Sequence, residues 1–420
     1  MARTLTPQDC HELMNLLQAE AIGKDNSIQV VDSSTFVSAG EKVLASGIEN
    51  TINTLYMLAG RLYVASRKYR GKLGLITAIS SGAYSDRLLK ISTYSKKAQA
   101  AGQWNTDLYT NLAPGYTSGE NGGASVKSQW EQNPPVNLEV NFGGRSVYDF
   151  SITIYEDQLK QAFRNEGEFA KYWAGVMQEF ANDLEQYKED WNRLAIINRI
   201  CADYDMVTLR GDETVVDLIA AFNEEFDTTY TRKELLTTYI KEFLEFLVAR
   251  LKIDTQRLTE RTVKYHWNPT KTVGGVEYDL LRHTPYSKQK FIVHSHFWTK
   301  AKAYVLPEIF NENRLSYDNF EEVSYWQNFN DPTAVKGTPA INDENFAQVK
   351  GDAVDLPYVF GILFDDDAVV TDFQIDYVRS TPVEARKGYR NIWYGFARNI
   401  CSDATENSII YILGEGGSQG

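Results

Sequence analysis

The spacing at which apolar residues recur along the sequence changes over residues 154–168. This change limits the fold more than any other feature. Before it, apolar residues alternate with polar ones over 136–142 and again over 148–154, with Gly143 and Gly144 between the two runs. Glycines in that place favour a hairpin, because a tight connection needs positive φ without a Cβ clash. We therefore expect a two-stranded β-hairpin here.

After the change, from Glu168 to Asp203, apolar residues recur at spacings of three and four, which is the period of one face of an α-helix. At about 1.5 Å per residue this helix is expected to be about 54 Å long, far beyond the usual three to four turns. A helix of that length is typical of a structural spar rather than of the core of a compact enzyme. An extended hairpin that leads into a spar indicates a building block.

Composition limits the class of protein. With 420 residues, 43% apolar content and a formal net charge of −13, the chain is expected to form two or three domains, and the charge gives no sign of nucleic-acid binding. Cys10, Cys201 and Cys401 are few and far apart, which argues against a disulfide framework and against a thiolate metal site. Because no secretory apolar region and no apolar run of bilayer length is present, we expect neither export by a signal peptide nor membrane insertion.

A basic segment stands out from this acidic background. Over residues 61–97 a lone acidic residue, Asp86, is outnumbered by Arg61, Arg67, Lys68, Arg70, Lys72, Arg87, Lys90, Lys96 and Lys97. Such a cluster is either a solvated face or a contact with an acidic neighbour or a polyanion, and the charge pattern weighs the two about evenly.

The pattern of the other segments suggests how the domains are arranged. Residues 100–135 are polar and turn-rich, which favours a loop that projects between the strand-like Leu89–Tyr94 and the strands after residue 135. Helical and strand-like segments alternate over about 210–380, which indicates an α/β or α+β domain. Alternating apolar residues over 389–413 predict a last pair of strands.

Two histidines offer candidate metal chemistry. His294 and His296 lie on one face of a predicted strand, a geometry that can bind Zn or Cu. His266 or His283 could complete such a site. A structural role is favoured, because no third ligand is close to the pair in sequence.

An acidic run offers a second candidate. Asp365, Asp366 and Asp367, with Asp372 and Asp376 nearby, can gather Mg²⁺ or Ca²⁺. A helix N-cap and first turn, or a plain surface position, is the favoured interpretation, because the run follows a strand and lacks the spacing of a calcium loop. No phosphate-binding loop, nucleophile elbow or dinucleotide fingerprint is present, and we expect no catalytic residue, no metal site and no cofactor.

Several short strings carry a resemblance to a known family. They are Ser151–Tyr155, Asp157–Phe163, Gly167–Phe169, Lys290–Leu315 and Arg386–Tyr394. With the order of the predicted parts, they resemble the major capsid proteins of tailed bacteriophages, which share the Hong Kong 97-type fold. The layout is most similar to that of short-tailed Bacillus phage capsid proteins, and it covers most of the chain.

The resemblance implies an α+β fold with an N-terminal arm, an extended β-hairpin loop, a long spine helix, and peripheral and axial domains. The implied boundaries are 1–82 for the helical arm, 83–154 for the extended loop, 155–210 for the peripheral domain with the spine helix, 211–384 for the axial domain, 385–413 for returning strands of the peripheral domain, and 414–420 for a flexible tail.

The function that the resemblance implies is structural, not enzymatic: self-assembly into the icosahedral shell that encloses a tailed phage's double-stranded DNA. Expected partners are other copies of the chain in pentamers and hexamers, a scaffolding protein, a portal, and packaged DNA bound on the inner face without sequence specificity, but no membrane. The expected location is the virion (capsid), with assembly in the host cytoplasm. An encapsulin-like nanocompartment shell and an acidic metalloenzyme remain alternatives.

The same reasoning predicts a subunit interface. An arm that projects from its own body cannot bury its apolar face there, so its strands are expected to lie across a neighbouring subunit in a large contact. The predicted interface residues are Val136, Leu138, Val140, Phe142, Tyr148, Phe150 and Ile152, together with the basic residues of 61–97.

Overall fold

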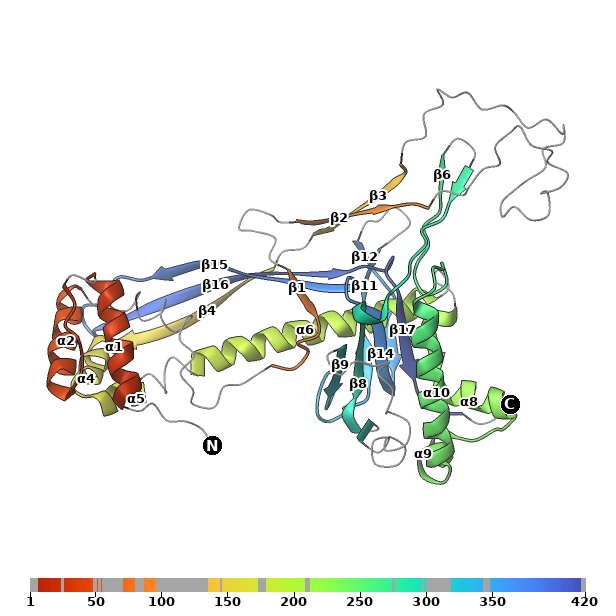
Figure 1. The fold of residues 1–420 in the computed structure, drawn as a ribbon, viewed down its shortest axis with the longest axis horizontal. Helices are drawn as coiled ribbons and strands as arrows, with labels where there is room; N and C mark the ends of the chain where they lie inside the picture. Colours follow the sequence, from red (N-terminus) through yellow and green to blue (C-terminus); the bar gives the residue numbers. More distant parts are fainter. Residues whose placement is uncertain are drawn as a thin grey trace. The chain divides into compact units, whose positions relative to one another are not determined.

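The computed structural model of the protein describes residues 7–23, 26–47, 51, 54, 71–79, 87–95, 135–143, 146–172, 179–207, 212–273, 276–296, 298–299, 319–342 and 348–416. The chain divides into two compact units, which are described separately (Figure 1). Unit 1 comprises Met1–Gly74, Ser146–Asn192 and Phe373–Arg398; unit 2 comprises Leu75–Arg145, Arg193–Asp372 and Asn399–Gly420. Three elements contribute residues to both units: α6 (Glu179–Asp205), β15 (Val369–Ser380) and β16 (Tyr389–Ser402).

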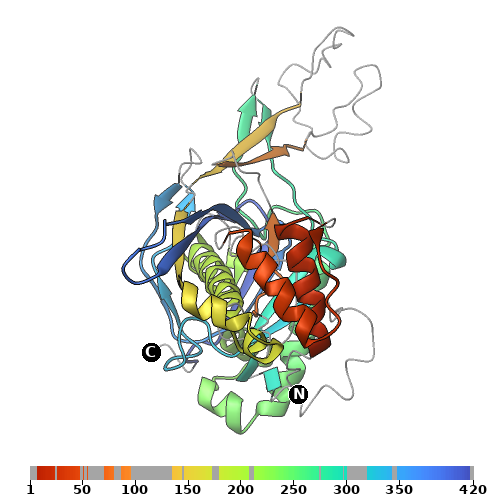
Figure 2. The same cartoon turned by 90° about the vertical axis from the view of Figure 1, so that its left-hand side faces the viewer.

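Helices that are distant in sequence share one core in unit 1. They are α1 (Pro7–Ala21), α2 (Ser33–Ala45), α4 (Glu156–Ala162) and α5 (Glu166–Tyr172), with α1 and α2 drawn in red beside the others in Figure 2. Asp32 begins α2 with a capping box, because its side chain accepts the Thr35 N–H while the Thr35 side chain bonds back to Asp32. The ring centroids of Phe36 and Phe163 lie 5.8 and 5.5 Å from that of Phe169.

The sheet of unit 1 has β4 (Ser146–Tyr155) at its edge. β4 pairs antiparallel with β16, from Tyr155 opposite Tyr389 to Ser146 opposite Arg398, and β15 flanks β16 on the other side. Ile154 and Ile392 are buried against the helical core, whereas most of β4 is exposed.

The predicted spar is present as a long helix. α6 has 27 residues, which is about 40 Å at 1.5 Å per residue. The prediction placed one continuous helix from residue 168 to 203. The structure has α5 and α6 over this range, and residues 173–178 lie outside the described residues.

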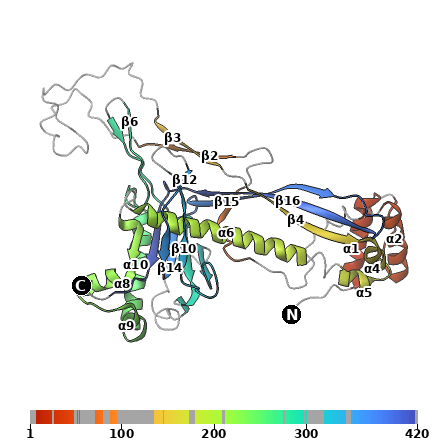
Figure 3. The same cartoon turned by 180° about the vertical axis from the view of Figure 1, so that it is seen from behind.

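A mixed five-stranded sheet forms the centre of unit 2, in the order β5 (Val215–Asp217), β17 (Ser408–Ile412), β14 (Val359–Asp365), β8 (Gln289–His294) and β9 (Phe320–Val323). Every residue of β14 is buried, which explains its uninterrupted apolar run. The sheet packs with α8 (Leu218–Phe226), α9 (Arg232–Thr237) and α10 (Ile240–Leu258) around one hydrophobic core (Figure 3). Parallel and antiparallel pairs both occur, so the domain is α+β.

A second feature of unit 2 is the antiparallel pair of β2 (Arg87–Thr93) and β3 (Asn137–Gly143), which we call the ribbon. The two strands predicted on either side of residues 100–135 are both present and pair with each other, while the predicted projecting loop itself lies outside the described residues. Smaller pairs are β6 (Lys271–Val273) with β7 (Val276–Tyr278), β10 (Val335–Gly337) with β13 (Val354–Leu356), β11 (Ala340–Asn342) with β12 (Gln348–Lys350), and β1 (Thr77–Ile79) with the start of β15. Within the described ranges, no helix combines the length and the apolar character needed to cross a bilayer.

Two predicted strand pairings are wrong. The hairpin expected over 136–154 does not form, because β3 pairs with β2 while β4 pairs with β16. The strands expected to pair over 389–413 lie in separate sheets, since β17 pairs with β14 and β5. Alternation shows that a strand has one buried face, but it carries no information about which strand lies beside it.

Candidate functional site

The apolar face of the ribbon is buried inside unit 2. Leu138, Val140 and Phe142 are 6%, 3% and 8% exposed. They form one cluster with the buried residues Tyr94, Leu280, Val370 and Cys401, and with half-buried Val136. The expectation that these β3 side chains have no partners in their own subunit, and must therefore lie across a neighbour, is wrong. The residues that bury them, such as Leu280 and Val370, are far away in the sequence. A periodic pattern along one strand does not predict which distant residues will contact it.

β2, the other strand of the ribbon, is held in place by ion pairs. The Lys90 ammonium lies 2.7 Å from Asp403 Oδ2 and 2.7 Å from Glu406 Oε1. Arg282 Nη2 lies 3.1 Å from the same Glu406 oxygen and donates a hydrogen bond to Ser92 Oγ at 2.7 Å. We call Lys90, Arg282, Asp403 and Glu406 the ionic clasp, because they fasten β2 to the segment between β16 and β17.

That segment is held in turn by the buried Arg199 of α6. Arg199 Nη1 donates to the backbone oxygen of Asp403 at 2.5 Å, and Nη2 donates to the backbone oxygen of Glu406 at 3.1 Å. Nη2 also donates to Ser408 Oγ at 2.7 Å, while Nε pairs with Asp203 at 3.0 Å. The guanidinium therefore fixes the loop that presents both clasp carboxylates.

In the ionic clasp, burial and ion pairing shift the pKa of each group in opposite directions. Burial alone would raise the pKa of Asp403, but the charge of Lys90 and hydrogen bonds from Lys90 and Thr405 lower this pKa below its ordinary value. Burial also dominates at Glu406 and raises its pKa, in spite of Lys90 and Arg282. For Lys90, burial lowers the pKa, but the two carboxylates outweigh it and raise the pKa above its ordinary value. Lys90 and Asp403 thus form the most firmly charged pair.

The predicted interface residues of β4 lie on the surface of unit 1. Tyr148 and Phe150 are 39% and 36% exposed, and Ile152 is half-buried. Tyr148 packs edge-on against the rings of Tyr187 and Trp191, with centroids 5.6 and 5.8 Å away. These three β4 residues stay interface candidates.

The predicted basic contact cannot be followed in full. Arg61, Arg67, Lys68, Arg70, Lys96 and Lys97 lie outside the described residues, and for Arg87 only the backbone, in β2, is described. Lys72 is exposed, and its backbone N–H donates to Glu189 Oε2 at 3.0 Å. The predicted outward-facing role is wrong for Lys90, because its charge is neutralised inside unit 2.

The acidic run forms a turn after β14 and begins no helix, so the predicted cap is wrong, whereas exposed Asp367 fits the alternative of a surface position. Asp365 ends β14, its Oδ1 accepts the Asp367 N–H at 2.9 Å, and its Oδ2 accepts the Thr284 hydroxyl at 2.6 Å. In the described part of the chain, no group of three or more His, Cys, Asp or Glu side chains is arranged to hold a metal ion.

The histidines are separated by the fold. His266 is buried between Asn407 Oδ1 and the backbone oxygen of Leu280, at 3.1 and 2.7 Å from its two ring nitrogens. His294 and His296 line a pocket without His266 or His283.

Sequence reasoning missed Arg199, Arg282, Asp403 and Glu406. The signal was weak but present: Asp403 and Glu406 stand in a short polar turn between two apolar runs, where acidic residues are usually solvated. Only their distance from Lys90 in space reveals a buried network.

Solved structures place the chain in a fold class. No family model matches the sequence, and no curated protein matches it. The matching folds are those of phage capsids, and the expected α+β capsid fold is confirmed. The capsid structure of Staphylococcus phage Andhra matches with a TM-score of 0.50 at 10% identity, over 83% of this chain and 86% of that chain. The capsid structure of the cyanophage P-SCSP1u matches with a TM-score of 0.41 at 12% identity, over 85% of this chain and 92% of that chain.

Proposed function

We propose that this chain is a major capsid protein whose copies assemble into the icosahedral shell around the double-stranded DNA genome of a tailed phage. The observation that carries the proposal is the extent of the fold match, which spans 83% of this chain and 86% of the Andhra capsid chain. A match of that extent is too large to be confined to either compact unit.

The surface of β4 supports assembly with further copies of the chain. Val147, Tyr148 and Phe150 on β4 are 52%, 39% and 36% exposed, and Trp393 on the paired strand is 40% exposed. Among the described strands of its sheet, β4 also lies at the edge. Exposed apolar side chains on an unprotected edge are typical of a protein contact.

The parts of the chain receive roles under this proposal. The ribbon is the base of the extended loop, α6 is the spine helix, and the five-stranded sheet belongs to the axial domain. Copies of the chain contact one another in pentamers and hexamers through β4 and the basic residues of 61–97 other than Lys90. A scaffolding protein, a portal and packaged DNA are the further partners, and the shell forms in the host cytoplasm before it becomes part of the virion.

Electron microscopy of the purified protein tests the proposal. The protein is expressed alone and together with a candidate scaffolding protein, and particles are examined by negative staining and analytical ultracentrifugation. Closed shells, or rings of five and six subunits, are expected. A monodisperse monomer at high concentration, with scaffold supplied, would refute the proposal.

A further inference from the structure

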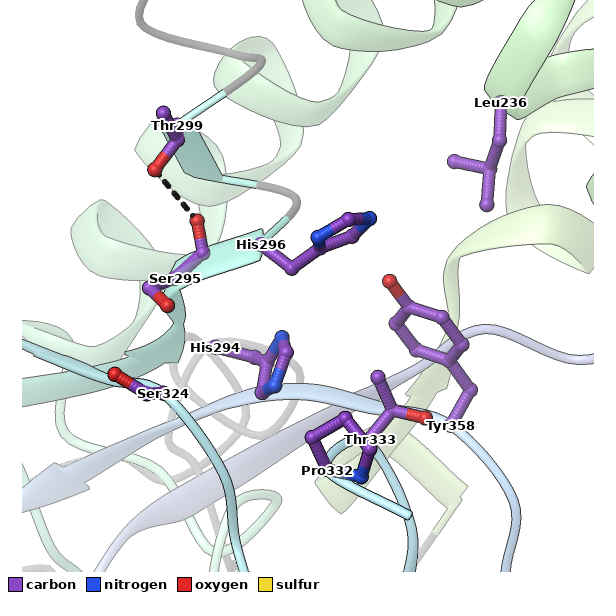
Figure 4. A pocket seen from close by; sticks show the side chains of 9 residues that line it. All are labelled: Leu236, His294, Ser295, His296, Thr299, Ser324, Pro332, Thr333 and Tyr358. Carbon is purple, nitrogen blue, oxygen red and sulfur yellow. Dashed lines mark hydrogen bonds between the residues drawn. The ribbon is translucent and has the colours of Figure 1, made fainter. Parts of the chain in front are cut away.

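His266 is a histidine enclosed by the body of unit 2. Its surroundings differ from those of His294 and His296, which line a pocket at the end of β8 (Figure 4). His266 is 0% exposed and lies in a segment that contacts the turn 403–407, between β16 and β17: the Trp267 N–H donates to the backbone oxygen of Ala404 at 2.9 Å. A buried ring that can take up a proton therefore lies against the turn that presents the carboxylates of the ionic clasp.

A chain of hydrogen bonds runs from the His266 ring to a carboxylate. Asn407 Oδ1 lies 3.1 Å from His266 Nδ1, and Asn407 Nδ2 donates to Thr284 Oγ1 at 3.1 Å. The Thr284 hydroxyl in turn donates to Asp365 Oδ2 at 2.6 Å. On the other side of the ring, Nε2 lies 2.7 Å from the backbone oxygen of Leu280. Asn407 and Thr284 are 0% exposed and Asp365 is 4% exposed, so the protein encloses the whole chain of bonds.

The direction of these hydrogen bonds determines the protonation of the ring. A hydroxyl has one proton, and because Thr284 donates it to Asp365, the Thr284 oxygen accepts from the amide nitrogen of Asn407. The amide oxygen of Asn407 therefore faces His266 Nδ1, while a backbone oxygen faces Nε2. Carbonyl oxygens only accept hydrogen bonds, so both ring nitrogens of His266 must donate. The imidazolium ion is the form of histidine that carries two N–H groups.

The opposite direction would need a proton on Asp365. The amide of Asn407 would then be turned over, the Thr284 hydroxyl would donate to it, and the Asp365 carboxyl would donate to Thr284. Asp365 is an acceptor at its other oxygen too, since Oδ1 accepts the Asp367 N–H at 2.9 Å. Hydrogen bonds donated to a carboxyl group favour its ionised form. These contacts therefore favour an imidazolium at one end of the chain and a carboxylate at the other.

The charges near this chain of bonds also favour a further cation. The charges of Asp403, Glu406 and Asp365 all act on Arg199 and oppose burial, which lowers its pKa to about 10. Among the described side chains of this network, the cations are Lys90, Arg199 and Arg282, and the carboxylates are Asp203, Asp365, Asp403 and Glu406. Three cations thus face four carboxylates. A protonated His266 balances the network, and unbalanced charge is costly in a buried region.

The other titratable groups on the surrounding segments supply no such cation. Tyr265 stays a neutral phenol, because burial raises its pKa. Asp279, next to Leu280, is half-buried and accepts a hydrogen bond from Asn268. The remaining groups are exposed or paired among themselves: His283, Lys264 with Glu213, and Asp254 of α10 with Arg250 and Arg257.

We propose that His266 is a proton-operated latch on the turn 403–407. Its imidazolium holds the turn through Asn407, and the same turn presents Asp403 and Glu406 to Lys90 of the ribbon. When the ring loses a proton, one of its nitrogens faces a carbonyl oxygen with a lone pair, and the turn loses a contact that holds it. The inference does not depend on the proposed capsid role, because it concerns the single subunit.

Nitrogen NMR of the histidine rings in unassembled wild-type protein tests the protonation state. The chain has 5 histidines, so labelled histidine in deuterated protein gives few signals. The His266 signal is the one missing from His266→Gln or, if that variant does not fold, the one that persists when the other histidines are replaced one at a time. At about pH 7, where a free histidine is mostly neutral, both ring nitrogens of His266 should carry protons. A neutral ring at that pH would overturn the proposal.

Urea denaturation at several pH values gives a second measurement. A histidine that holds its proton more tightly in the folded chain adds stability that is complete below about pH 6.5 and is lost as the pH rises through its folded value. Within that window, the unfolding constant of His266→Gln divided by that of wild type should fall about tenfold per pH unit. His283→Gln is the matched control, because His283 is exposed, and its ratio should stay within about twofold of one. A ratio for His266→Gln that does not change with pH would contradict the proposal.

Hydrogen exchange of the wild-type protein tests the latch itself. After correction for the intrinsic effect of pH on exchange, amides of β2 should exchange about fivefold faster once His266 has lost its proton, which is the factor expected for one lost hydrogen bond. Peptides from α8, outside the network, should show no such step. Protection of β2 that stays constant through the titration of His266 would show that the ring holds no latch. A protein that never assembles would remove the capsid proposal but not this one.

Discussion

Lys90 is the residue on which the ionic clasp depends most. Its ammonium serves both carboxylates, whereas Arg282 reaches only Glu406. Asp403 is 1% exposed, so water cannot replace a lost cation there. A buried charge that loses its partner costs far more than a broken ion pair at the surface.

Replacing Lys90 with Met should therefore destabilise the subunit by about 3 kcal/mol. Urea denaturation of unassembled protein measures the loss. Lys171→Met is the matched control: it breaks an ion pair with Glu168 in which both side chains are at least half exposed, and should change stability by no more than about 0.5 kcal/mol. Equal effects of the two substitutions would show that the clasp stabilises nothing.

The ionic clasp should also stop stabilising the subunit at high pH, when Lys90 loses its proton. The pKa of Lys90 in the folded protein is raised above the ordinary lysine value of 10.5. The stabilisation by Lys90 is therefore fully present below pH 10.5 and is lost as the pH rises through the folded pKa. The stability difference between wild type and Lys90→Met should shrink between about pH 8 and about pH 11.5, whereas the ordinary titration of tyrosines cancels in this difference. A constant difference would contradict this assignment.

At the scale of the element, the spacing of apolar residues predicted correctly whether a segment is a helix or a strand. It did not predict which strands pair with each other. The alternation over 136–142 and the helical spacing after residue 179 produced the expected strand and helix. The neighbours of β3 and β4 were beyond prediction, because strands pair through backbone groups that are the same in every residue. The candidate site shared this limit: the outward-facing aromatic residues of β4 were identified, but the burial of Leu138 depends on Leu280 and Val370.

Opposite faces of the ribbon should respond differently to the same substitution. Leu138→Asp places a carboxylate in the buried apolar cluster around Leu280 and should cost about 4 kcal/mol, because the charge loses its hydration there. Ile91→Asp, at a position that is 58% exposed on β2, should change stability by about 0.5 kcal/mol at most. Thermal denaturation of unassembled protein compares them. If Leu138→Asp were as stable as Ile91→Asp, the buried face would be assigned wrongly.

At the scale of the whole molecule, the fold is preserved where sequence identity is not. The Andhra capsid chain shares 10% identity with this one, over 83% of this chain and 86% of that chain. Most positions are therefore free to change as long as periodicity, burial and a few ionic contacts persist.

On the capsid proposal, β4 should control assembly without controlling folding. Val147→Asp adds a charge at a position that is 52% exposed on the edge strand, and it should leave thermal stability within about 0.5 kcal/mol while it blocks shell formation. Val31→Asp, 66% exposed in unit 1 outside β4, should still assemble. Electron microscopy of both proteins reads the outcome. Normal shells from Val147→Asp would exclude β4 from the contacts between subunits.

The ionic clasp has an evolutionary consequence. It joins β2, the segment before β8 and the turn before β17, which are far apart in the sequence. A lineage that loses the charge at position 90 must alter positions 403 and 406 in the same period or carry an unstable subunit. Substitutions at these places are therefore expected to arrive as a set, and related sequences should show them as correlated changes across hundreds of residues of chain.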